Sequence, residues 1–276
     1  MVQTQAKVLY QNVLRTSLTS GGLVFAPDAG VDDNPAGFPP QNLTDWRDFS
    51  LYRVSGTGTG GDISGTFGAA VSVNSVGIYA RVPQGVGESF SVTISVTISA
   101  VPNVLGVFAF GDTGTASDMN PLRMLSFTQK DIADTDSVEV TIIRTAGLVC
   151  DIRQIAIGLE LEFPRGQHVG MTPTVNQGGI IRKNIISVNG SIIASNVRRV
   201  EKRDTIDLDY LEPDWVRTTW NAFSVHATRY PFFRKWNPTQ YPLEVDWCAA
   251  EGIELPTNAH RKGKMAVSMP LYCLAR

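Results

Sequence analysis

The stretch SVTISVTISA, residues 91–100, alternates Val and Ile with Ser and Thr over ten residues. Successive side chains of an extended strand point to opposite faces, so Val92, Ile94, Val96 and Ile98 share one face. The hydroxyl side chains share the other face. A strand with one aliphatic and one polar face is typical of an antiparallel sheet that covers a core with one side. The stretch therefore predicts a layered β structure in this half of the chain.

Further strand patterns lie on both sides of this stretch. The predicted strands are 71–82, 105–110, 137–144 and 152–163. Clusters of Gly, Pro and Asp separate them, at 56–61, 82–88, 111–121 and 134–136. Many short strands between such turns indicate a sandwich or jelly roll. No helix with strong periodicity is predicted before residue 165.

The second half has a different pattern. Residues 161–179 contain two prolines, four glycines and little periodicity, which predicts a hinge. Asn189-Gly190 stands between two apolar runs, and this dipeptide favours a two-residue hairpin turn. We expect the hairpin to pair 183–188 with 191–196, and a third strand to follow at 204–210.

A helix is predicted at about 213–227, because Pro213 suits a first helical turn and apolar residues recur with helical spacing. The predicted apolar face comprises Trp215, Thr219, Ala222, Phe223 and His226. Two closing strands are expected at 241–252 and 264–275. The predicted fold class is mainly β, with a β-sandwich or jelly roll followed by a smaller α+β domain of antiparallel strands and one helix.

The length of 276 residues exceeds that of a typical single core, so we expect two domains. The expected boundaries are 1–163 for the jelly roll, 164–179 for a linker and 180–276 for the α+β domain. One large β domain is the alternative. Residues 1–166 carry 10 Lys and Arg against 16 Asp and Glu, and residues 167–276 carry 14 against 10. This asymmetry favours two domains and could help opposite-signed surfaces associate, although chance composition explains it equally well.

Composition excludes several classes of function. No apolar run approaches about 18 residues, so no membrane span is predicted, and the N-terminus lacks a signal-peptide pattern. The basic cluster RRVEKR at 198–203 has acidic residues around it, so nucleic-acid binding is not expected. The sequence contains no phosphate-loop, nucleophile-elbow or zinc-helix motif, and we predict no enzyme, no cofactor and no metal site.

The three cysteines, Cys150, Cys248 and Cys273, are far apart in the sequence and odd in number. This spacing fits neither a disulfide framework nor a set of metal ligands. We expect buried free thiols, with a Cys248–Cys273 bridge as the alternative.

The segment NPAGFPPQNLTDWRDFSLYRVSG, residues 34–56, leads into the strand pattern VSVNSVGIYARV at 71–82. Together with RQIAIGLELEF at 153–163 it resembles the discoidin or galactose-binding-like jelly roll, over about residues 20–163. Members of that family often bind sugars through loops at one end of the sandwich. The resemblance makes Trp46 and Arg47 a candidate loop site for a host glycan. In the alternative interpretation Trp46 packs against the core and Arg47 pairs with an acid.

Residues 229–248, RYPFFRKWNPTQYPLEVDWC, contain six aromatic residues and three prolines. We expect Phe232, Phe233 and Trp236 to pack against the helix. Large aromatic residues also dominate subunit interfaces. The candidate interface residues are Tyr230, Trp236, Tyr241 and Trp247.

The run of Pro231, Phe232, Phe233, Trp236, Pro238, Tyr241, Pro242, Glu244, Val245 and Cys248 after a helix is similar to a segment of small tail and tail-tip proteins of long-tailed phages. The resemblance covers about residues 180–276. It implies a structural virion component that is assembled in the host cytoplasm into a homo-oligomeric ring or cap of the phage tail. The implied partners are the tail tube, hub and fibre proteins.

The alternative function is a host-surface carbohydrate-binding module of a phage tail. A third class, a glycan-cleaving enzyme, would need two carboxylates across a cleft, and the acids of this sequence are scattered in turns.

Overall fold

The computed structural model describes residues 5–19, 22–27, 31–32, 38–47, 50–112, 120–166, 179–186, 189, 192–258 and 263–274. The chain forms two compact units, which we name by their architecture. The sandwich unit is Val8–Leu161, and the sheet unit combines Met1–Lys7 with Glu162–Arg276. Compared with the expected boundaries, the first seven residues group with the C-terminal part of the chain. Residues 167–178 of the predicted hinge lie outside the described residues.

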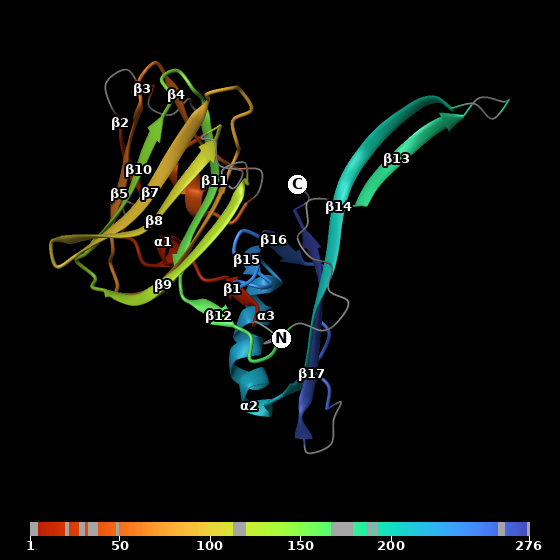
Figure 1. Cartoon of the computed structure of the whole chain (residues 1–276). Helices are drawn as coiled ribbons and strands as arrows, with labels where there is room; N and C mark the ends of the chain where they lie inside the picture. Colours follow the sequence, from red (N-terminus) through yellow and green to blue (C-terminus); the bar gives the residue numbers. More distant parts are fainter. Residues whose placement is uncertain are drawn as a thin grey trace. The chain divides into compact units, whose positions relative to one another are not determined.

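The sandwich unit contains two five-stranded sheets (Figure 1). The first has the order β2 (Val24–Pro27), β5 (Gly60–Thr66), β10 (Ser137–Arg144), β7 (Ser89–Ile98) and β8 (Val101–Gly111). The second has the order β3 (Val31–Asp32), β4 (Tyr52–Gly56), β11 (Cys150–Gly158), β6 (Val71–Ala80) and β9 (Leu122–Ile132). Neighbouring strands are antiparallel throughout. The predicted mainly β fold class is confirmed.

The core of this unit lies between the two sheets and follows the period-two pattern. Val92, Ile94 and Val96 of β7 are fully buried, as the alternation predicted, and Ile98 is partly buried at the strand end. Two short helices complete the unit, α1 (Val13–Thr16) and the 3-10 turn η1 (Pro40–Thr44). Asn12 caps α1, and its side-chain amide also donates to the carbonyl of Ile155 at 2.8 Å, which fastens the helix to β11.

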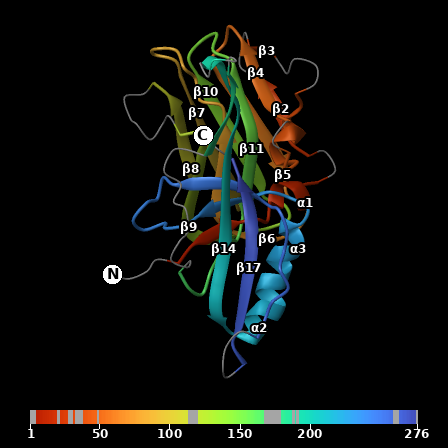
Figure 2. The same ribbon diagram turned by 90° about the vertical axis from the view of Figure 1, so that its right-hand side faces the viewer.

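The sheet unit is built on a seven-stranded sheet. Its order is β12 (Glu160–Glu162), β1 (Lys7–Leu9), β15 (Phe232–Lys235), β16 (Val245–Ala250), β17 (Met265–Cys273), β14 (Ile192–Leu211) and β13 (Gly179–Ile186). The third strand expected at 204–210 is the second half of the long strand β14. Figure 2 shows β14 and β17 side by side, in agreement with their antiparallel pairing from Lys202 to Leu211.

The predicted helix is present and runs from α2 (Pro213–Trp215) through a π turn (Val216–Trp220) into α3 (Asn221–Ala227). Its buried face lies one residue later than predicted. The residues that face the interior are Val216, Trp220, Phe223, Ser224 and Ala227. The predicted helical spacing is correct, but its starting residue is wrong, because both Trp215 and Val216 are apolar. Among the described residues, no helix is both long enough and apolar enough to span a bilayer.

The aromatic stretch corrects one packing prediction. Residues Phe232–Lys235 form a strand, so consecutive side chains point to opposite faces of the sheet. Phe232 contacts the helix, with its ring centroid 4.9 Å from that of Phe223. Phe233 packs against Trp247 at 4.7 Å, and Trp236 stacks on Tyr241 at 5.2 Å.

Candidate functional site

The loop that follows η1 holds the first pair of candidate residues. Trp46 is 4% exposed, has a φ of 63° and donates its backbone N–H to Oε1 of Gln154 at 3.1 Å. Its ring therefore offers little aromatic surface for stacking on a sugar. Arg47 is exposed, and its backbone N–H donates to Oδ1 of Asp45 at 3.0 Å.

A polar cluster that the sequence did not reveal lies where β6 ends and β11 begins. Arg53 of β4 donates to both carboxylate oxygens of Asp151, at 2.6 and 2.9 Å. Arg81 reaches the same carboxylate at 3.6 Å and keeps 72% of its side chain exposed. The Arg53 guanidinium also lies 4.8 Å from the ring centroid of Phe38, and its hydrogen bonds to Asp151 raise the pKa of Arg53. We name Phe38, Arg53, Arg81 and Asp151 the arginine cluster.

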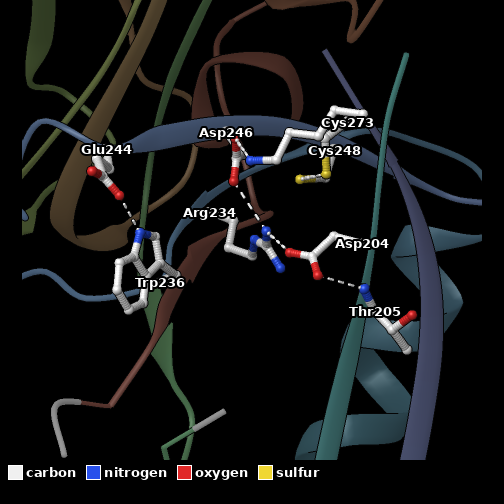
Figure 3. Close-up of polar contacts among 9 residues, drawn as sticks. Asp204, Thr205, Arg234, Trp236, Glu244, Asp246, Cys248 and Cys273 are labelled. Carbon is white, nitrogen blue, oxygen red and sulfur yellow. Dashed lines mark hydrogen bonds and ion pairs between the residues drawn. The ribbon is translucent and has the colours of Figure 1, made fainter. Parts of the chain in front are cut away.

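The four candidate interface residues of the sheet unit occupy different environments. Trp247 is buried in β16, whereas Tyr230 is half-buried and lies beside His226. Tyr241 is 39% exposed and stacks on the half-buried Trp236. Trp236 in turn donates its indole N–H to Glu244 at 2.5 Å (Figure 3). Tyr241 and Trp236 thus form one surface feature, and Trp247 belongs to the packed sheet.

A buried charge cluster lies on strands β14, β15 and β16 of the sheet unit (Figure 3). Nη2 of Arg234 donates to Asp204 at 2.5 Å and to Asp246 at 3.0 Å, and Lys202 donates to the other oxygen of Asp246 at 2.8 Å. The positive charges of two cations therefore offset the negative charges of two carboxylates. The Arg234 side chain in this site has no exposed surface. Such balance is needed because an unpaired buried charge is strongly unfavourable.

The thiols of Cys248 and Cys273 lie beside this cluster (Figure 3). In the part of the chain that the structure describes, Asp246, Cys248 and Cys273 form the one group whose possible metal-ligand atoms lie within 4.8 Å of one another. The carboxylate of Asp246 already accepts from Lys202 and Arg234, and these two cations oppose the approach of a third. The donor set therefore does not fit a metal ion.

An acidic groove lies on the sheet unit along β14 and β17. The cavity has a volume of about 320 Å³, and Asp207, Asp209 and Glu254 line it together with Leu255. Leu255 is 86% exposed. The groove combines three carboxylates with apolar surface, which suits a basic and partly aliphatic segment.

The strands β13 and β14 form the most unusual feature of the sheet unit. Within the described residues, β13 pairs with β14 alone, and residues 192–201 of β14 pair with β13 alone, because β17 begins its pairing with β14 at Lys202. The result is a two-stranded ribbon that extends beyond the end of β17 (Figure 1). We name residues 179–201 the ribbon. The ribbon includes four basic residues, Arg182, Lys183, Arg198 and Arg199, and one acidic residue, Glu201.

Asn189 lies in a turn between the ribbon strands, at the position of the predicted hairpin. The predicted pairing of 183–188 with 191–196 is confirmed for Lys183, Asn184 and Ile185, which pair with Asn196, Ser195 and Ala194, and the register shifts by one residue only at Ile186. The first strand begins at Gly179 and ends at Ile186, which pairs with Ile192. Residues 187–188 and 190–191 lie outside the described residues.

Comparisons with known proteins gave matches among solved structures only. No family model and no curated protein matches the chain. A GH29 fucosidase of Ruminococcus gnavus in complex with fucose is 16% identical, with a TM-score of 0.37 over 55% of this chain and 27% of that chain. The family 32 carbohydrate-binding module of C. perfringens NanJ, in complex with galactose, is 12% identical, with a TM-score of 0.37 over 56% of this chain and 99% of that chain.

The family 32 module of AlyQ, in complex with 4,5-unsaturated mannuronic acid, is 20% identical. It has a TM-score of 0.34 over 54% of this chain and 96% of that chain. The similar structures thus include both carbohydrate-binding modules and a larger enzyme, of which this chain spans about a quarter.

Proposed function

We propose that this chain is a non-catalytic structural component that works by protein–protein assembly, with the ribbon as its principal contact element. The observation that carries the proposal is the lack of a third strand beside the ribbon among the described residues. An isolated two-stranded ribbon is marginally stable in water, and its unpaired edges are templates for another strand. A partner that pairs with or covers the ribbon would satisfy both conditions.

Charge complementarity favours further copies of the same chain as partners. The ribbon is basic, whereas the sandwich unit carries 8 Lys and Arg against 15 Asp and Glu. The acidic groove of the sheet unit offers a second complementary surface. A contact between two different surfaces of identical copies is head-to-tail, and it generates a ring where the rotation closes.

The setting we propose for this assembly is the tail of a long-tailed phage. It comes from the sequence resemblance over residues 180–276. In this proposal the chain lies in the virion, is assembled in the host cytoplasm, and contacts tube, hub or fibre proteins beside its own copies.

The test is the mass of the full-length protein by light scattering at low and high salt. We expect oligomers at low salt that dissociate toward monomers near 0.5 M salt, because ions screen contacts between exposed charges. The double variant Arg182→Glu/Lys183→Glu should be monomeric. The matched control is Arg217→Glu/Arg229→Glu, which changes the net charge equally at two exposed residues, one on the helix and one in the turn after it, and should assemble normally. A wild-type monomer under all these conditions, with no retention of phage tail proteins, would overturn the proposal.

The second candidate function is carbohydrate binding by the sandwich unit; the NanJ and AlyQ modules are carbohydrate-binding modules in complex with sugars. The arginine cluster supports this candidate. The exposed guanidinium of Arg81 can donate to sugar hydroxyls, the buried Asp151 holds it in place, and the partly buried Phe38 adds an apolar surface.

A glycan array tests this candidate. Retention of the wild type, loss with Arg81→Ala and no loss with Arg15→Ala would support it, because both arginines are exposed residues of the sandwich unit. No retention of the wild type on any glycan would count against it.

A further inference from the structure

Cys248 and Cys273 occupy directly opposite positions on the neighbouring strands β16 and β17. The backbone N–H of Leu274 donates to the carbonyl of Trp247 at 2.8 Å, so the hydrogen bond flanks the cysteine pair rather than joining it. In an antiparallel sheet the side chains of such a non-hydrogen-bonded pair are the closer ones. The two sulfur atoms are 2.8 Å apart, and neither residue has exposed surface (Figure 3).

We propose that Cys248 and Cys273 are an oxidation site that takes up a low-molecular-weight disulfide such as oxidised glutathione and becomes an intramolecular cross-strand disulfide. One cysteine, as its thiolate, attacks a sulfur of oxidised glutathione and releases one glutathione thiolate. The other cysteine then attacks the protein sulfur of this mixed disulfide and releases the second glutathione. Two protons leave the cysteines, the two cysteines are oxidised, and one oxidised glutathione is reduced to two molecules of glutathione.

The surroundings of the pair determine when this reaction takes place. Burial raises the pKa of Cys248 well above its ordinary value, and the neighbouring Asp246 and Cys273 act in the same direction. The Arg234 guanidinium opposes this rise, and Lys202 and Asp204 complete the charged groups of the cluster. Since the thiolate is the nucleophile, the folded protein should react slowly at neutral pH. Oxidation should be fast when the sheet opens or while the chain folds.

The disulfide would join β16 and β17, two adjacent central strands of the sheet unit. Thiols stay reduced in a cytoplasm and oxidise outside it. The disulfide would therefore form after the protein leaves a reducing compartment. The inference stands on the register and the sulfur contact alone, and it does not depend on the proposed function.

The experiment uses full-length protein that is unfolded and refolded with either oxidised glutathione or dithiothreitol. Thiols are then counted in denaturant, and the intact mass is measured. The reduced protein has three thiols, and we expect one after oxidation, with a mass lower by that of two hydrogen atoms. A peptide containing Cys248 joined to Cys273 should appear in a non-reducing digest. The urea midpoint of the sheet unit should be higher in the oxidised protein.

Cys150→Ser is the matched control, because it should still form the bridge and leave no free thiol. Cys248→Ser and Cys273→Ser should each keep two thiols and show no oxidant-dependent shift of the midpoint. Should these two variants fail to fold, the wild type and Cys150→Ser still decide the question. Three persistent thiols, a dimer on a non-reducing gel, or one equivalent of bound zinc in place of the bridge would each overturn the proposal.

Discussion

Replacement of Arg234 by Met should destabilise the sheet unit strongly. The guanidinium bridges Asp204 and Asp246, and Lys202 is the other cation of the cluster. Without Arg234 two buried carboxylates share one ammonium group. The loss of one partner from a buried ion pair costs about 3–5 kcal/mol.

Two features of the wild type place the expected loss near the lower end of that range. Among the described residues, Nε and Nη1 of Arg234 have no hydrogen-bond partner. Each buried donor without a partner costs about 1–3 kcal/mol, and the substitution removes both donors. Methionine also fills much of the volume of the arginine stem. We therefore expect a decrease of about 3 kcal/mol in the free energy of unfolding.

The assay is equilibrium urea unfolding followed by tryptophan fluorescence. Four of the five tryptophans, all except Trp46, belong to the sheet unit, so the signal reports mainly on that unit. A Trp46→Phe background removes the remaining signal, which matters because two units need not unfold together.

Arg203→Met is the matched control. Arg203 also lies in β14 and pairs with Glu251 at 3.5 Å, but 62% of its side chain is exposed, so it should cost at most about 1 kcal/mol. The double variant Arg234→Met/Asp204→Asn should regain part of the loss, because Asp246 keeps its bond to Lys202. Equal, small losses for Arg234→Met and Arg203→Met would refute the balanced-charge account.

Three further predictions concern other sites. Gly60→Ala should destabilise the sandwich unit by roughly 3 kcal/mol in urea unfolding, because φ is +147° and a Cβ would lie 1.8 Å from the carbonyl oxygen of Ile142. Gly147→Ala, with positive φ but open space, should cost only about 1–2 kcal/mol, and equal losses would contradict the steric argument. Burial raises the pKa of the Cys150 thiol to about 12 from an ordinary 9.0. At a pH between these two values, the thiol loses its proton in the unfolded state and keeps it in the folded state. Stability should fall with rising pH by up to about 1.4 kcal/mol per unit from this group, and a circular-dichroism pH series on Cys150→Ala should lack that part of the decline. Trp247→Ala should cost about 3–5 kcal/mol in thermal or urea unfolding, whereas Tyr241→Ala should cost no more than about 1.5 kcal/mol, and a reversal of this order would place Trp247 at the surface.

The strands of the sandwich unit were predictable because each has one face in the core and one toward solvent. Alternation such as that of β7 follows directly from this arrangement. The strand Phe232–Lys235 gave no such signal, since all four of its residues are buried and two of them are charged. Arg234 and Lys235 are buried like the two phenylalanines, so the polarity of these residues does not show which face of the strand they lie on.

The side-chain clusters could not be predicted for a different reason. Arg53 and Asp151 are 98 positions apart, and Arg234 and Asp204 are 30 apart. These residues meet through sheet register, which no short spacing in the sequence encodes. The sequence suggested the Cys248–Cys273 pair as an alternative, but only the register of β16 and β17 places the two residues opposite each other.

The chain passes from one unit to the other within its first strand, β1, and passes back within β12. These two positions bear on whether one chain can combine the two candidate functions. The division between the units falls within β1 and within β12, two three-residue strands that are neighbours in the seven-stranded sheet. The backbone N–H of Phe163 donates to the carbonyl of Ala6 at 2.9 Å, and Lys7 pairs with Glu162 at 3.6 Å. The sandwich unit is thus an insertion whose two ends leave the sheet unit side by side. Insertions of this kind keep the host fold intact, because the host needs only two adjacent attachment points. The proposed assembly through the ribbon and the proposed recognition through the arginine cluster therefore depend on residues of different units, so one chain can combine the two.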